Sequence, residues 1–147
     1  MTDQSLLLVT ICDERAAIAS DNIRSVVELD AVTPVPRSPG HIAGLAALRS
    51  RAMTVVDCRR SLELPPAECT GQPLAVVVEI EEFLYALVVD AVEEVVPFDG
   101  EAHEIRADLL PGWERAAVGM VETSAGPALM LEPASLIAGP SNKQKAA

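Results

Sequence analysis

Two aspartates, Asp57 and Asp90, interrupt otherwise apolar segments of this 147-residue chain. Two carboxylates that converge on a substrate can act as general acid and general base. The sequence places no nucleophile, metal-ligand cluster or oxyanion element beside either of them. We therefore predict that both make structural hydrogen bonds where strands bend. A small β-barrel enzyme that uses Asp57 and Asp90 is the alternative from another class.

The cysteines and histidines predict neither a metal site nor a catalytic pair. Cys12, Cys58 and Cys69 are odd in number and widely spaced, without a CxxC motif, as expected of reduced thiols. His41 and His103 are isolated, and no GxGxxG, P-loop, HExxH or GxSxG motif occurs. We expect no catalytic residue, no cofactor and no metal ion.

The charge of the chain excludes several classes of partner. Its 22 acidic residues outnumber 11 basic ones, for a net charge of −11, whereas nucleic-acid binding depends on clustered lysine and arginine. The same charge disfavours an anionic membrane surface. No apolar run approaches the roughly 20 residues of a membrane span, and the N-terminus lacks the basic region of a signal peptide. Proteins or small molecules are the expected partners, with no nucleic acid and no membrane insertion.

Short apolar runs separated by turn residues must position the polar side chains. Half of the residues are hydrophobic, so the chain can bury a sizeable core. The runs predict strands over residues 6–11, 23–29, 53–58, 74–80, 83–96, 117–122 and 127–132. Asp90 would mark a bulge or bend in the long strand, residues 32–52 would form a proline-rich loop, and Pro111-Gly112 a turn. Short helical turns are expected at residues 20–22, 59–62 and 133–138. This pattern indicates an all-β fold of small barrels or a sandwich.

Three motifs follow one another in a recognisable order. The first is an extended proline run through Thr33, Pro34, Val35, Pro36, Pro39, Ile42 and Gly44. The second is Leu48-Arg49-Ser50 followed by TVVDCR at residues 54–59, and the third is LVVDAVEEV at residues 87–95. Together they resemble the CheW-like family of chemotaxis coupling proteins, over roughly residues 5–138. Ser50 stands where that family usually has glycine, and Ala47 where it has asparagine.

The resemblance implies two small five-stranded, SH3-like β-barrels that share a hydrophobic core. One CheW-like domain of two intertwined subdomains would span residues 1–138, and residues 139–147 would form a flexible C-terminal tail. The implied function is that of a non-catalytic adaptor that couples chemoreceptors to the histidine kinase CheA. It would be cytoplasmic and recruited to membrane-bound receptor clusters. Because of Ser50 and Ala47, an auxiliary or competing protein of a non-flagellar chemosensory pathway is the alternative.

The resemblance also implies where partners bind. The receptor tip would lie in a groove between the barrels, and the barrel ends would pair with CheA. The candidate receptor- and kinase-binding residues are Val26, Glu28, Ile42, Leu45, Arg49, Ser50 and Arg59. We expect Glu28 and Arg49 to form an ion pair, Val26 to be exposed, and Val27 to lie in the core. The exposed strand edges of such barrels also permit weak self-association.

Overall fold

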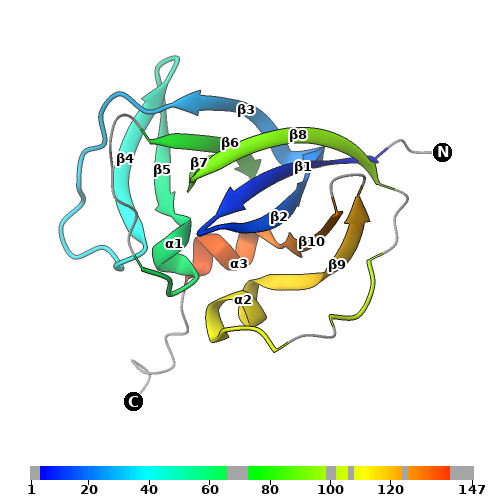
Figure 1. Ribbon diagram of the computed structural model, residues 1–147. Coiled ribbons are helices and arrows are strands. Elements are labelled where there is room, and N and C mark those ends of the chain that lie inside the picture. Colours follow the sequence, from blue (N-terminus) through cyan, green and yellow to red (C-terminus); the bar gives the residue numbers. More distant parts are fainter. Residues whose placement is uncertain (1–3, 66–72, 99–101, 106–107, 124–125, 140–147) are drawn as a thin grey trace.

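The computed structural model describes residues 4–65, 73–98, 102–105, 108–123 and 126–139 (Figure 1). Ten strands form two five-stranded sheets, each curved into a small barrel, which confirms the predicted fold class. The first barrel has the order β8-β1-β2-β10-β9, and the second has the order β3-β6-β7-β5-β4. The tail predicted for residues 139–147 lies outside the described residues from residue 140 onward.

The strands of each barrel come from separate parts of the chain. The first barrel contains β1 (Gln4–Ile11), β2 (Glu14–Ala19), β8 (Ala91–Phe98), β9 (Ala117–Thr123) and β10 (Gly126–Leu131). The second contains β3 (Ile23–Glu28), β4 (Ile42–Leu48), β5 (Arg51–Asp57), β6 (Leu74–Ile80) and β7 (Phe83–Val89). The chain therefore leaves the first barrel after β2 and returns to it at β8, so neither barrel is a continuous segment.

Short α-helices contribute buried side chains to the core between the two barrels, and a 3-10 turn connects β2 to β3. These elements are the 3-10 turn η1 (Ser20–Asn22), α1 (Cys58–Ser61), α2 (Pro111–Ala116) and α3 (Pro133–Ala138), and α3 packs against both α1 and α2 (Figure 1). The prediction of a turn at Pro111-Gly112 was wrong, because Pro111 begins α2, where its fixed φ suits a first helical position. Gly112 lets α2 approach α1, since a Cβ there would lie 1.9 Å from the carbonyl oxygen of Leu62.

The strands bury both of their faces because each barrel has its own interior and also packs against the other. In β1, Leu6 and Leu8 face the interior of the first barrel, while Leu7 and Val9 face the core shared between the barrels. The same alternation holds in β6. Val76 and Val78 face the shared core, while Ala75 and Val77 face the interior of the second barrel. This arrangement explains why the predicted strands are continuous apolar runs.

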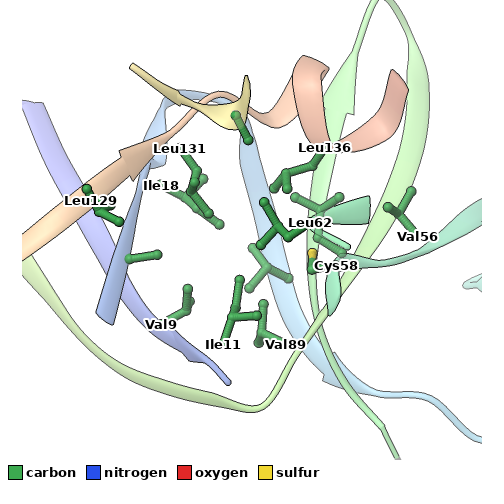
Figure 2. Close-up of a cluster of buried hydrophobic side chains, with 14 of the residues drawn as sticks. Val9, Ile11, Ile18, Val56, Cys58, Leu62, Val89, Leu129, Leu131 and Leu136 are labelled. Carbon is green, nitrogen blue, oxygen red and sulfur yellow. The ribbon is translucent and has the colours of Figure 1, made fainter. Parts of the chain in front are cut away.

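The shared core joins the two barrels into one body (Figure 2). Side chains from both barrels and from the helices between them point into one space: Val9, Ile11, Ile18, Leu129, Leu131, Val56, Val89, Cys58, Leu62 and Leu136. Trp113 is buried in the same cluster. Truncating one such leucine to alanine typically costs about 2–5 kcal/mol. Because both barrels contribute side chains to this one cluster, the predicted shared hydrophobic core is confirmed.

Two predicted boundaries were wrong for identifiable reasons. Residues 83–96 do not form one strand, since β7 and β8 belong to different barrels and the chain crosses at Asp90. A run of apolar residues does not reveal that its two halves pack in different sheets. Residues 42–48 form β4, although alanine and glycine have low strand propensity. Pairing with β5, and a bridge from Leu45 to Thr33, stabilises this strand.

Candidate interaction surface

The predicted binding residues lie in three places: strand β3, strand β4 with the turn that follows it, and helix α1. Val26 and Glu28 lie on β3, four more lie on β4 or its turn, and Arg59 lies on α1. Side chains alternate along β3, so Val26 and Glu28 are exposed while Val27 packs against the barrel interior. Val26 is 41% exposed, as predicted. It is one of six large apolar side chains that are exposed among the described residues.

The turn between β4 and β5 has only two residues, Arg49 and Ser50. Both adopt positive φ values, 49° and 74°, and Leu48 pairs with Arg51 to close the hairpin. This geometry favours Asn-Gly, because a side chain with positive φ is strained by about 1–2 kcal/mol. Ser50 therefore occupies a position where glycine would be relaxed, while the turn still forms.

Two apolar candidates on β4 have different surroundings. Leu45 is 42% exposed and pairs with Thr54 of β5, so its side chain is available at the outer face of the barrel. Ile42 begins the strand and is half-buried against the shared core. Leu45 is therefore the stronger candidate for a partner contact, and Ile42 also supports the core.

The predicted ion pair between Glu28 and Arg49 is not present. Among the described residues the ion pairs are Arg15–Glu93, Arg24–Glu79 and Arg59–Asp90. Glu28 lies at the end of β3 opposite Leu74, whereas Arg49 lies at the tip of the β4–β5 hairpin. Both residues are exposed to solvent. An exposed ion pair contributes only about 0–1 kcal/mol, because solvent screens the charges and ordering the two side chains costs entropy.

Arg59 is held by Asp90 rather than presented freely to solvent. Its Nε donates to Oδ1 of Asp90 over 3.0 Å, its Nη2 donates to Oδ2 over 2.5 Å, and its Nη1 donates to the carbonyl of Pro65. Oδ2 also accepts the backbone N–H of Cys12 over 2.7 Å. Partial burial opposes ionisation of Asp90, but these hydrogen bonds and the guanidinium charge outweigh it and lower the pKa of the carboxyl.

The two aspartates make structural hydrogen bonds, as predicted. Oδ1 of Asp57 accepts the backbone N–H of Arg60 over 3.3 Å and caps α1, while Asp90 holds the crossover. Both carboxylates line one pocket, so they are not remote from each other. A general acid requires a raised pKa, and that of Asp90 is lowered. The neighbouring Cys58 is fully buried, and this burial raises the pKa of its thiol, which keeps it unreactive.

The pocket that these aspartates line was not predicted from the sequence. It has a volume of about 390 Å³ and lies where β5 and β7, which run parallel, come to their ends. Its lining residues are Leu29, Val32, Ala43, Val55, Asp57, Arg59, Arg60, Pro73, Val88 and Asp90. They are scattered from residue 29 to residue 90, so only the barrel brings them together. The polar ends of the two apolar strands, at Asp57 and Asp90, were the available signal.

His41 has a structural partner. It is 5% exposed, and its Nε2 lies 2.7 Å from the carbonyl oxygen of Ile137, which ties the start of β4 to α3. His103 lies on a short bridge to Met120. Within the described residues, no three histidine, cysteine or acidic side chains are grouped to hold a metal ion. Cys69 lies outside the described residues. None of the described helices has the length and apolar character needed to cross a bilayer.

Comparisons with known proteins agree with this geometry. The family model of the CheW-like domain matches residues 5–140. A probable chemotaxis protein CheW of Rhizobium etli is 29% identical over 114 residues, covering 73% of this chain and 72% of that protein. The chemotaxis protein CheW of Rhizobium meliloti is 23% identical over 113 residues, covering 77% and 73%. The crystal structure of scaffolding protein TtCheW from Thermoanaerobacter tengcongensis has a TM-score of 0.77 at 21% identity, over 89% of this chain and 90% of that one.

Proposed function

The chain belongs to the CheW-like family and is a non-catalytic chemotaxis coupling adaptor, and we propose that it couples by binding two proteins directly. The partners are the histidine kinase CheA and the cytoplasmic tips of chemoreceptors. Residues 1–138 act as the adaptor body, in which two barrels hold kinase and receptor in a fixed relative geometry. Small receptor movements then change kinase activity because the adaptor does not absorb them.

The shared core supports this mechanism of rigid positioning. Side chains of both barrels and of α1 and α3 interlock in it, so the barrels cannot rotate against each other without opening a packed interior. Packed interiors have low compressibility and transmit displacement. The clamp of Arg59 on Asp90 adds a polar link at the crossover between the barrels.

The exposed apolar residues of the second barrel support the location of a partner surface. Val26 and Leu45 are 41% and 42% exposed on β3 and β4, close in sequence to the charged residues Glu28 and Arg49. Apolar contacts surrounded by charges are typical of protein interfaces, in which the apolar residues contribute most of the affinity. We place partner contacts at Val26 on β3, near Glu28, and at Leu45 on β4, near Arg49, at the two edge strands of the second sheet.

Co-sedimentation with receptor fragments and an in vitro kinase assay test this proposal. Val26→Ser and Leu45→Ser should each weaken binding of a receptor cytoplasmic fragment or of CheA by about tenfold, and Arg49→Ala should weaken it less. Val118→Ser is the matched control, because Val118 is 57% exposed on β9 of the first barrel. Receptor control of CheA should require the wild-type chain. Unchanged binding by the three variants would refute the surface, and no binding to either protein would refute the function.

Recruitment to receptor clusters is the cellular counterpart of this binding. A fluorescent fusion of the chain should form foci in cells that contain receptors and should become diffuse when the receptors are deleted. Foci that persist without receptors would contradict recruitment by receptor tips.

A further inference from the structure

The pocket at the end of the second barrel has an apolar floor. Leu29 and Val55 belong to the interior cluster of that barrel, and Val32 and Val88 pack against the same cluster. Its volume of about 390 Å³ falls within the range of about 300–1,000 Å³ that is usual for small-molecule sites. The floor is therefore suited to an aliphatic group a few carbons long.

The residues that line the pocket also include two acidic and two basic ones, and only one acidic and one basic side chain pair with each other. Arg59 and Asp90 bind each other through two hydrogen bonds. Asp57 and Arg60 form no ion pair with each other, although both line the pocket. Within the described residues, the Arg60 guanidinium has no hydrogen-bond or ion-pair partner, and Asp57 bonds only through Oδ1.

These features define the chemistry of a matching ligand. The charges of the four charged lining residues sum to zero, while the chain as a whole is strongly acidic. The electrostatic potential of the protein therefore does not attract a ligand with net negative charge. A ligand with one positive and one negative group matches the free carboxylate oxygen of Asp57 and the free guanidinium of Arg60. Its remaining part must be aliphatic in order to cover Val55 and Val88.

We propose that this pocket binds a free aliphatic α-amino acid in its zwitterionic form. Asp57 accepts the ammonium group, Arg60 donates to the carboxylate, and the side chain covers Leu29, Val55 and Val88. This activity goes beyond coupling and would give the adaptor a small-molecule input of its own. The pocket adjoins α1 and Asp90, so an occupant would contact the helix and the crossover that link the barrels.

Isothermal titration calorimetry on the full chain, with L-leucine as the probe, tests the proposal. We expect saturable binding of one equivalent. We also expect at least about tenfold weaker binding of 4-methylpentanoate, which lacks the ammonium, and of 3-methylbutylamine, which lacks the carboxylate. Absence of saturable binding by L-leucine, or equal affinity for either analogue, would overturn the proposal.

Variants locate the binding on the chain. Arg60→Gln and Asp57→Asn should each weaken L-leucine binding by at least about tenfold, and asparagine retains the ability to cap α1. Arg37→Gln, which changes an exposed loop arginine outside the pocket, should leave the affinity unchanged. Thermal unfolding of each variant establishes that it is folded. Folded Arg60→Gln and Asp57→Asn proteins with wild-type affinity would exclude this pocket.

Discussion

Arg59 and Asp90 form a two-point contact at the place where the chain crosses from the second barrel to the first. Asp90 separates β7 from β8, and its carboxylate also accepts the backbone N–H of Cys12 in the β1–β2 turn. Its own N–H donates to the carbonyl of Thr10 over 3.0 Å. One aspartate thereby links α1, the crossover and the β1–β2 turn, so the geometry between the barrels depends on it.

The first prediction is that Asp90→Asn destabilises the chain by about 1–3 kcal/mol. Asparagine keeps an acceptor oxygen but removes the charge that pairs with Arg59, and hydrogen bonds to charged groups contribute about 1.5–3 kcal/mol. Urea unfolding followed by circular dichroism measures the change. Glu94→Gln on β8 is the control, because Glu94 is exposed and should tolerate the loss of charge. A free energy of unfolding equal to wild type would show that the clamp is not structural.

The second prediction concerns acid stability. The pKa of Asp90 is lowered from 3.8 in the folded chain, because the bonds from Arg59 and Cys12 outweigh the effect of burial. A lowered folded-state pKa stabilises the fold above the unfolded-state pKa, and this stabilisation is lost as the pH falls through the folded value. Wild type should therefore lose more unfolding free energy than Asp90→Asn between about pH 5 and pH 2.

Glu93→Gln serves as the comparison for this pH experiment. The pKa of Glu93 is also lowered, first by the hydroxyl of Thr10 and then by Arg15. This variant should keep the part of the acid-dependent loss that belongs to Asp90. Parallel pH profiles for wild type and Asp90→Asn would show that Asp90 does not titrate with folding.

The barrels were predictable from the sequence because their strands are long apolar runs. Residues 74–80 form β6 as predicted, and the closing hairpin of β9 and β10 also agrees. The strand β4 was not predictable, since Ala43, Gly44 and Ala46 carry no strand signal and tertiary pairing alone holds them extended. The crossover at Asp90 was predicted as a bend, but the switch between sheets depends on packing that no local pattern encodes.

The candidate surface was predictable in part. Period-two alternation correctly placed Val26 outside and Val27 inside. The prediction of an ion pair between Glu28 and Arg49 was wrong. It assumed from the family pattern that the two side chains lie close together, whereas two solvated, exposed charges gain little by pairing. The free state of Arg60 was unpredictable, since it depends on which neighbours Asp57 and Asp90 bind.

The third prediction is that Ser50→Gly stabilises the chain by about 0.5–1 kcal/mol. Ser50 has a φ of 74°, which strains a side chain, and glycine removes this strain at some cost in unfolded-state entropy. The melting temperature measured by thermal unfolding should rise by about 1–4 °C. Ser5→Gly in β1 is the control and should be destabilising, because glycine weakens a strand interior. A lower melting temperature for Ser50→Gly would contradict strain in this turn.

The fourth prediction is that Gly44→Ala destabilises the chain by about 2–4 kcal/mol. A Cβ at Gly44 would lie 2.2 Å from the carbonyl oxygen of Thr33, and its φ of 149° is unfavourable for alanine. Gly40→Ala is the matched control, since its nearest contact would be a guanidinium nitrogen of Arg60 at 3.7 Å. Urea unfolding compares the two. Equal effects would mean that the Thr33–Leu45 bridge is not held by close backbone approach.

The fifth prediction is that Arg115→Met costs about 1–3 kcal/mol, although methionine fills a similar volume. Arg115 on α2 donates through Nη1 to the carbonyl of Ser135 over 2.6 Å and through Nη2 to the carbonyl of Ser61. It thereby ties α2 to α1 and α3, and burial lowers the pKa of its guanidinium. Methionine leaves the carbonyl of Ser61 without a donor, whereas the carbonyl of Ser135 still accepts the backbone N–H of Gly139 over 3.1 Å. One unsatisfied buried group costs about 1–3 kcal/mol.

Arg115→Lys separates the hydrogen bonds from the charge. An ammonium group keeps the charge but lacks the planar fork that reaches two carbonyls at once, so this variant should be destabilised by about half as much. Thermal unfolding should place the melting temperatures in the order wild type, lysine, methionine, with a total span of about 3–10 °C. If methionine proved as stable as wild type, the three helices would be held together by the apolar contacts of Leu62, Trp113 and Leu136 alone.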